Sequence, residues 1–257
     1  MIKVNQISKN FGGVTAVDNV TIDISAGSIT GLIGPNGAGK TTLFNLISGN
    51  VEPSSGQVYF DGSNVTGMTS NDLFHKGLLR TFQIPHEFGK LTVLENLMVV
   101  PGNQTGESLL SSWIKPKRIQ YEEKINLEKA RDVLDLLKLG QVENELAGNL
   151  SGGQKKLLEL GRTMMVEAKA VLLDEVGAGV NRTLLRDIEE IIIKLHRDSG
   201  YTFFMIEHDL EFISRLCNHV IVLSEGAMLM EGTPREVQEN EAVIEAYLGA
   251  KKRVNHQ

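Results

Sequence analysis

The stretch Gly34-Pro35-Asn36-Gly37-Ala38-Gly39-Lys40-Thr41 decides the fold of this chain. It fits the pattern G-x-x-x-x-G-K-[ST], in which backbone N–H groups curl around phosphate oxygens, the lysine reaches the β- and γ-phosphates and the hydroxyl ligates Mg²⁺. The apolar run 29–33 predicts a strand before it. Helical spacing over 43–47, with Gly49 as a stop, predicts a helix after it. The sequence therefore predicts a phosphate-binding loop at a helix N-terminus, where the partial positive charge favours anions.

Length and composition limit the class of protein. The 257 residues suffice for one large α/β domain or two small ones, and the net charge of −6 offers no basic footprint for nucleic acid. We interpret the basic stretch 251–253 as a solvated tail. The single cysteine, Cys217, excludes an internal disulfide and favours a reducing compartment. Because no apolar run approaches about 18 residues and the start lacks a signal-peptide pattern, we expect a cytoplasmic protein.

Hydrophobic patterning predicts an α/β organisation. Residues 1–30 resemble short strands of an antiparallel layer. Apolar strands at 170–174 and 202–206 enclose a helical pattern. Such a strand–helix–strand order is typical of a mainly parallel sheet covered on both faces. The region from about 85 to 150 looks like a helical insertion. The remaining expectations are a helix over 125–139 ended by Gly140, a hairpin over 221–230 turning at Glu225-Gly226, and a final amphipathic helix over 235–248.

Two acids follow the predicted strand 170–174. Asp174 closes the strand, which places its carboxylate at the sheet edge beside the phosphate loop, where it can hold Mg²⁺ directly or through water. Glu175 comes next and can polarise the water that attacks the γ-phosphate. The alternative reading is two solvated acids at a strand end, which the upstream loop disfavours.

A second phosphate-binding helix start occurs at Leu150-Ser151-Gly152-Gly153-Gln154. Two such termini with one phosphate loop indicate a composite site. With this pentapeptide, the loop and the Asp174-Glu175 strand, the chain resembles the ATP-binding cassette (ABC) family over its whole length. The resemblance implies a P-loop NTPase cassette: a mainly parallel RecA-like sheet, an N-terminal antiparallel β subdomain and an inserted helical signature subdomain. The implied boundaries are 1–84 and 151–233 for the catalytic core, about 85–150 for the helical subdomain, and 234–257 for the C-terminal helix and tail.

The resemblance also implies individual roles. Phe11 would stack on adenine, with a core aromatic as the alternative, and Val17 would be a second adenine contact. Gln83 would contact Mg²⁺ and the attacking water, and His208 the γ-phosphate. The implied catalytic residues are Glu175, His208 and Gln83, and the implied Mg²⁺ ligands are Thr41, Gln83 and Asp174. The implied ATP-binding residues are Phe11, Val17, Gly34, Pro35, Asn36, Gly37, Ala38, Gly39, Lys40, Thr41, Thr42, Ser151, Gly152, Gly153 and Gln154.

The mechanism that the resemblance implies is ATP hydrolysis between two cassettes arranged head to tail. The second cassette would be a copy of this chain or a sister subunit, and its Ser151 and Gly153 would cap the γ-phosphate. The expected partners are transmembrane permease subunits and, indirectly, an extracytoplasmic solute-binding protein. Such a subunit would lie in the cytoplasm, peripheral on the inner face of the cell membrane.

Segments 77–83, 91–97, 112–114 and 243–249 are most similar to the ATP-binding proteins of branched-chain amino acid importers. Urea or amide importers and lipopolysaccharide exporters carry similar pieces. A soluble cassette protein of DNA repair or translation is disfavoured, because those proteins generally have two cassettes, long coiled coils or zinc cysteines. A pure binding module would be expected to lose Lys40, Glu175 or His208.

The sequence departs from the family pattern just after the acids. Val176 stands where proline is usual, and Asn181 where aspartate is usual. We expect hydrolysis to persist because Glu175 is kept, with weaker coordination between the two sites. Trp113, with Leu109 and Leu110, would lie near the membrane partner or pack on the chain's own helical subdomain.

Overall fold

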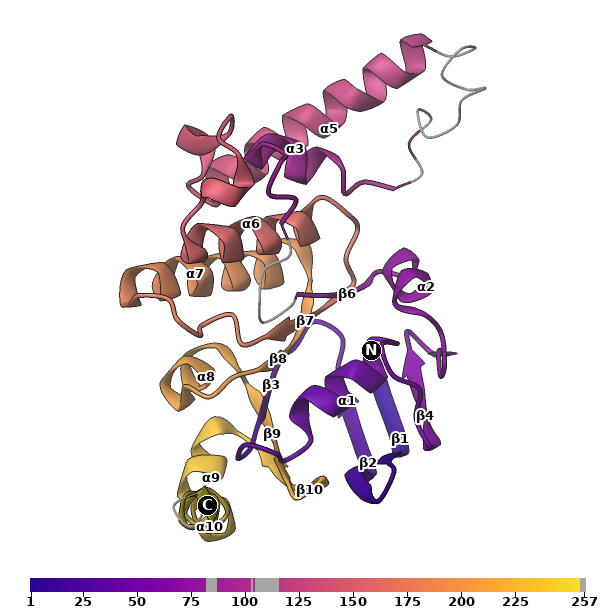
Figure 1. The fold of residues 1–257 in the computed structure, drawn as a ribbon, viewed down its shortest axis with the longest axis vertical. Helices are drawn as coiled ribbons and strands as arrows, with labels where there is room; N and C mark the ends of the chain where they lie inside the picture. The colour runs from indigo at the N-terminus through magenta and orange to yellow at the C-terminus, as the bar shows by residue number, and fades with distance from the viewer. Residues whose placement is uncertain (82–86, 103, 105–115, 255–257) are drawn as a thin grey trace. The chain divides into compact units, whose positions relative to one another are not determined.

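A computed structural model describes residues 1–81, 87–102, 104 and 116–254 (Figure 1). The chain divides into two compact units. The first unit comprises Met1–Gln83, Lys169–Ala178 and Ile192–Gln257, and the second comprises Ile84–Ala168 and Gly179–Ile191. Residues 151–168 and 179–191, which were expected from the sequence in the catalytic core, group here with the helical insertion. The expected functional boundaries stay a prediction.

The first unit contains an antiparallel sheet with strand order β2-β1-β4-β5. Its strands are β1 (Ile2–Phe11), β2 (Val14–Ile24), β4 (Ser55–Phe60) and β5 (Ser63–Asn64). Ile2 and Val4 are buried while Lys3 between them is exposed, as a half-buried strand requires. The antiparallel layer predicted at the N-terminus is confirmed, but the prediction of short strands is wrong, since β1 has 10 residues and β2 has 11.

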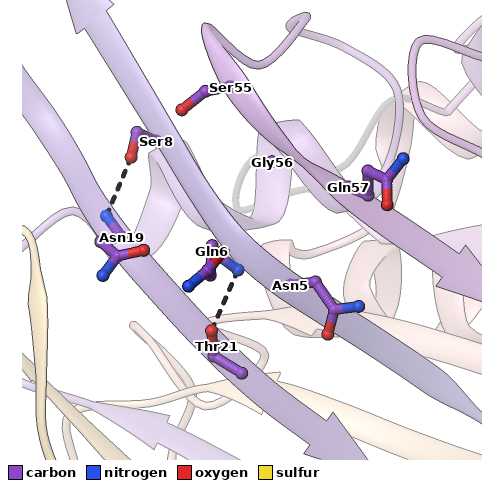
Figure 2. A pocket seen from close by; sticks show the side chains of 8 residues that line it. All are labelled: Asn5, Gln6, Ser8, Asn19, Thr21, Ser55, Gly56 and Gln57. Carbon is purple, nitrogen blue, oxygen red and sulfur yellow. Dashed lines mark hydrogen bonds between the residues drawn. The ribbon is translucent and has the colours of Figure 1, made fainter.

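The ladder between the two long strands is interrupted by irregularities. The pairing of β1 with β2 shifts register three times, and both Gln6 and Asn19 adopt a positive φ. Side chains replace the ladder bonds lost there: Gln6 N donates to Thr21 Oγ1 and Asn19 N to Ser8 Oγ, each at 2.9 Å. Figure 2 shows the open polar depression that results. It is lined by Asn5, Gln6, Ser8, Asn19, Thr21, Ser55, Gly56 and Gln57, none of which is ionisable.

The larger sheet of the first unit has the strand order β10-β9-β3-β8-β7-β6 (Figure 1). Its strands are β3 (Ile29–Ile33), β6 (Leu78–Arg80), β7 (Ala170–Asp174), β8 (Thr202–Ile206), β9 (His219–Ser224) and β10 (Ala227–Gly232). Neighbours are parallel except β9 and β10. Every residue of β3, β7 and β8 is buried, which confirms the predicted mainly parallel sheet covered on both faces. The carboxyl ends of these three neighbouring strands therefore share one edge.

Besides its part of α7 (Arg182–Ser199), the first unit contains five helices among its described residues. They are α1 (Lys40–Ile47), α2 (Ser70–His75), α8 (Leu210–Leu216), α9 (Pro234–Glu239) and α10 (Glu241–Val254). Two of them, α2 and α8, were not predicted from the sequence. Gly49, with φ 72°, follows α1 as predicted. The single helix expected over 235–248 is wrong. Asn240 has the extended backbone angles φ −78° and ψ 121°, and its Oδ1 accepts the Val243 N–H at 3.2 Å, so it ends α9 and caps α10.

The second unit is helical. Its elements are α3 (Val93–Met98), α5 (Pro116–Leu136), α6 (Gly152–Met164) and the 3₁₀ turns η2 (Gly140–Val142) and η3 (Ala147–Asn149), and it takes the N-terminal part of α7 (Arg182–Ser199). Three helices meet at Gly161 in α6, where a Cβ would lie 3.1 Å from Val133 Cγ1 in α5 and 3.4 Å from Leu97 Cδ2 in α3.

Two sequence expectations fall in this unit. The helix end predicted at Gly140 is wrong, because α5 ends at Leu136 and Lys138 takes the left-handed conformation with φ 58°. Trp113, Leu109 and Leu110 lie outside the described residues. Among the helices that the structure describes, none is long and apolar enough to cross a membrane.

Candidate functional site

The phosphate-binding loop joins β3 to α1 as predicted. Gly37 has φ 80° and Gly39 has φ 97°, conformations that favour glycine. A Cβ on Gly39 would stand 2.4 Å from the carbonyl oxygen of Ala16, whereas a Cβ on Gly37 would meet no described atom within 4 Å. The loop is thus packed on one side and open on the other, which is the shape of a cradle for an anion.

Lys40 points back over this loop. Its side chain is buried, and Nζ donates to the carbonyl oxygens of Gly34 at 2.7 Å and Pro35 at 3.0 Å. Burial lowers the pKa of Lys40, and the negative charges of Glu175 and Asp174 oppose that shift. The two acids are therefore within electrostatic reach of the ammonium group. On the first turn of α1, Thr41 is exposed and Thr42 is half-buried.

Asp174 ends β7 and is held by a partner that sequence reasoning missed. Its Oδ2 forms an ion pair with Arg80 Nη2 at 2.8 Å, and both side chains are less than a tenth exposed. Arg80 Nη1 also donates to Asn45 Oδ1 at 2.6 Å and to Ser48 Oγ at 3.1 Å. Arg80 thereby connects the edge strand β6 with β7 and with the helix that follows the phosphate loop. The only sequence signal was a cation at the end of a short apolar run.

Glu175 stands in a strained conformation beside His208. Its φ of 51° is uncommon for a residue with a side chain, and its N–H donates to the Ile206 carbonyl at 3.0 Å. Glu175 Oε1 lies 2.7 Å from His208 Nε2, although the two residues are 33 positions apart in the chain. The adjacency of β7 and β8 brings them together. The His208 side chain is 44% exposed, which leaves it accessible to a ligand.

Glu207 is a second residue that sequence reasoning missed. It is almost fully buried, and its Oε1 accepts the Gly177 N–H at 2.8 Å while its Oε2 accepts the His208 N–H at 3.4 Å. One carboxylate thus joins the loop after Glu175 to the loop that carries His208. No sequence pattern marks Glu207, since it follows a strand like many solvated acids.

The two expected adenine contacts differ in their surroundings. Phe11 ends β1 and is 49% exposed, with Lys9 Nζ 5.1 Å from the centre of its ring. About half of the Phe11 side chain is accessible, and its stacking on adenine stays a prediction. Val17 is fully buried, and a Cβ on Gly39 would lie 3.5 Å from its Cγ2. Val17 therefore packs beneath the phosphate loop, and its contact with adenine stays a prediction.

The second helix start lies in the second unit. Ser151 caps α6: its Oγ accepts the Gln154 N–H at 3.4 Å, and Gln154 Oε1 accepts the Ser151 N–H at 3.0 Å. Ser151 and Gly152 are exposed, whereas a Cβ on Gly153 would come within 2.1 Å of Leu184 Cδ2. The expected anion-binding terminus is therefore exposed to solvent at its first two residues.

Of the two replacements after Glu175, the structure explains the one at Asn181. Val176 is buried. Asn181 Oδ1 accepts the Leu184 N–H at 2.9 Å and so caps the start of α7, a role that asparagine fills as well as aspartate. Gln83 lies among residues 82–86, outside the described residues.

A parallel sheet carries a glycine-rich loop, a buried lysine, an Asp-Glu pair and a histidine on its neighbouring strand ends, and these features define a P-loop ATPase. A family model described as "ABC transporter" matches residues 17–178, and one described as "Branched-chain amino acid ATP-binding cassette transporter" matches residues 227–252. The chain belongs to the ABC transporter family, and it is an ATP-binding, ATP-hydrolysing subunit of that family.

Curated relatives match over nearly the full length. A probable branched-chain amino acid transport ATP-binding protein of Archaeoglobus fulgidus is 39% identical over 253 residues, covering 97% of this chain and 96% of the relative. A high-affinity protein of the same description from Pseudomonas aeruginosa is 34% identical, with 97% and 98% covered. A crystal structure of an ABC transporter cassette in its ADP conformation is 38% identical, with a TM-score of 0.82 and coverage of 97% and 98%.

Proposed function

We propose that this chain hydrolyses ATP to drive the uptake of branched-chain amino acids. One observation carries the proposal: Glu175 projects from the end of β7 onto His208 at 2.7 Å, within electrostatic reach of the phosphate-loop lysine. The match of residues 227–252 and the full-length similarity to branched-chain amino acid transport proteins support the solute class.

The nucleotide would occupy the cradle of residues 34–42. The open side at Gly37 faces where phosphate oxygens would sit, and Lys40 would exchange its loop carbonyls for the β- and γ-phosphates. Phe11 would stack on the adenine ring. Exchanging neutral carbonyl partners for anionic oxygens strengthens each hydrogen bond of the lysine.

The oxygen donors at this site fit Mg²⁺. Asp174 offers a carboxylate and Thr41 an exposed hydroxyl, and Mg²⁺ commonly takes one or two such protein ligands beside substrate phosphates and water. Gln83 is the third residue proposed to hold the ion. When bound, Mg²⁺ neutralises charge on the phosphate oxygens.

Hydrolysis then needs a positioned water. The water oxygen bonds to the γ-phosphorus while the bond from that phosphorus to the bridging oxygen of ADP breaks. Glu175 orients the water and receives its proton, and His208 donates to a γ-phosphate oxygen. The strained backbone of Glu175 and the buried carboxylate of Glu207 hold these two groups in fixed positions.

The site is completed by a second cassette, a copy of this chain or a sister subunit. Ser151, Gly152, Gly153 and Gln154 of that cassette would cap the γ-phosphate, so that ATP joins the two and its hydrolysis separates them. Permease subunits would receive this motion, and a solute-binding protein outside the membrane would deliver the amino acid. The chain would then sit on the inner face of the cell membrane as a peripheral subunit.

The test is phosphate release from MgATP by the chain purified with its membrane subunits and reconstituted in vesicles. We expect a binding protein loaded with leucine, isoleucine or valine to stimulate release, and Glu175→Gln to abolish it. Stimulation by urea or an amide, with none by these amino acids, would contradict the proposed solute class.

A further inference from the structure

The C-terminal part of the chain touches the phosphate-binding loop through the turn between β9 and β10. Glu225 and Gly226 form this turn, both with positive φ, as the sequence predicts for the hairpin. Gly226 N donates to the Ala38 carbonyl at 3.2 Å. The Leu223 carbonyl oxygen lies so close to Gly34 that a Cβ there would be 2.1 Å away. The hairpin thus packs directly on the loop backbone.

A second contact comes from α10. The Tyr247 hydroxyl oxygen accepts the backbone N–H of Gly34 at 2.9 Å, across 213 positions of sequence. Val243 on the same helix is buried, and α10 packs on α9, which in turn packs on β9 and β10. Burial raises the pKa of Tyr247, so the hydroxyl keeps its proton at neutral pH. Tyr247 is therefore a fixed, neutral partner for the first residue of the loop.

Gly34 links this tyrosine to the phosphate-contacting lysine. Its N–H is bound to Tyr247 and its carbonyl accepts Lys40 Nζ at 2.7 Å. Gly34 is buried, so an N–H without an acceptor there would carry the penalty of an unsatisfied polar group. Loss of the tyrosine hydroxyl would leave the Gly34 N–H without this acceptor and would loosen the start of the phosphate-binding loop.

We propose that Tyr247 is a positioning residue for nucleotide binding: from the C-terminal helix it fixes Gly34, and through Gly34 the backbone at the start of the phosphate-binding loop. Tyr247 touches no reacting atom, so its effect falls on nucleotide affinity. The C-terminal helix α10 thereby contributes to nucleotide binding. This rests on the proposed function, in which the loop and Lys40 hold phosphate.

The experiment compares Tyr247→Phe with Tyr59→Phe by titration calorimetry with MgADP and MgATP. Tyr59 is a matched control, because its hydroxyl donates to Gln57 Oε1 at 2.8 Å in the antiparallel sheet. We expect Tyr247→Phe to bind nucleotide about five- to tenfold more weakly, as the loss of one hydrogen bond implies, and Tyr59→Phe to bind as the wild type does. In hydrolysis, KM for ATP should rise while kcat stays within about twofold.

Unchanged affinity in Tyr247→Phe, or an equal loss in both variants, would overturn the inference. If the wild type itself bound no nucleotide, the proposed function would fail instead. A second measurement needs no variant: without nucleotide, the Gly34 amide of the wild type should exchange slowly with deuterium. Rapid exchange of that amide would also overturn the inference.

Discussion

At the residue scale, the buried carboxylate of Asp174 is paired with the buried guanidinium of Arg80. Asp174 would be a buried anion without Arg80, and Arg80 would be a buried cation without Asp174. Breaking such a pair is costly because the remaining charge stays out of water, even where the intact pair adds little net stability. Arg80 therefore secures the carboxylate that we propose holds Mg²⁺.

We predict that Arg80→Met lowers the free energy of unfolding by about 3 to 5 kcal/mol, because it leaves Asp174 buried without its cation. Urea denaturation measures this. The control is Lys3→Met, which breaks the exposed pair with Asp23 and should cost less than about 1 kcal/mol. Equal losses of unfolding free energy in the two variants would contradict the prediction that breaking the buried pair costs more than breaking the exposed one.

We also predict that Cys217 is unreactive in the folded protein. Burial, with the charge of Glu207 as a smaller cause, raises the pKa of its thiol to about 12. At pH 8 the thiolate is then at least about a thousandfold scarcer than for an exposed cysteine of pKa about 8.5. A thiol reagent at pH 8 should label the protein only after denaturant is added. Rapid labelling of the native protein would mean that the thiol is accessible.

The site residues that the sequence could predict are those in short local patterns. Lys40, Asp174, Glu175 and His208 each follow or lie beside a recognisable strand, and parallel strands bring their ends to one edge. Arg80, Glu207 and Tyr247 were missed because their partners lie far away in sequence. Only the folded chain brings Tyr247 to Gly34.

At the scale of the helices, four capping boxes in the described part of the chain allow a controlled comparison. Thr69, Thr92, Ser151 and Thr233 cap α2, α3, α6 and α9 in the same way. Of these four residues, only Ser151 is proposed to contact phosphate. Thr92 caps a helix in the same compact unit as Ser151 and therefore serves as the control. Structural and functional effects at Ser151 can therefore be separated.

We predict that Ser151→Ala and Thr92→Ala each lower the free energy of unfolding by about 1 kcal/mol through loss of a cap. Only Ser151→Ala should also weaken MgATP-dependent association of the cassettes, measured by analytical ultracentrifugation in the Glu175→Gln background. If Thr92→Ala weakened association to the same degree, the effect would come from general destabilisation.

The type of most elements could be predicted, whereas several boundaries could not. Hydrophobic periodicity predicted the strands around the loop, the β9–β10 hairpin and the α7 region, since burial dictates these patterns. The break at Asn240 and the end of α5 depend on one side-chain cap and one left-handed residue, Lys138. Lysine is common inside helices, and a single asparagine within a continuous amphipathic pattern is not enough to mark a helix end.

At the scale of the whole molecule, the proposed chemistry is divided between the two compact units. The phosphate loop, Asp174, Glu175 and His208 belong to the first unit, and Ser151 with its helix belongs to the second. We propose that these sets meet across two cassettes, with ATP between them. Nucleotide state would then control association, which is the output that a transporter can use.

The most direct test is sedimentation of Glu175→Gln with MgATP and with MgADP. This variant keeps the shape of the site and removes the proposed base, so ATP should be bound but not cleaved. We expect dimers that retain ATP in MgATP and monomers in MgADP. A protein that stays monomeric in MgATP and retains no nucleotide would contradict it.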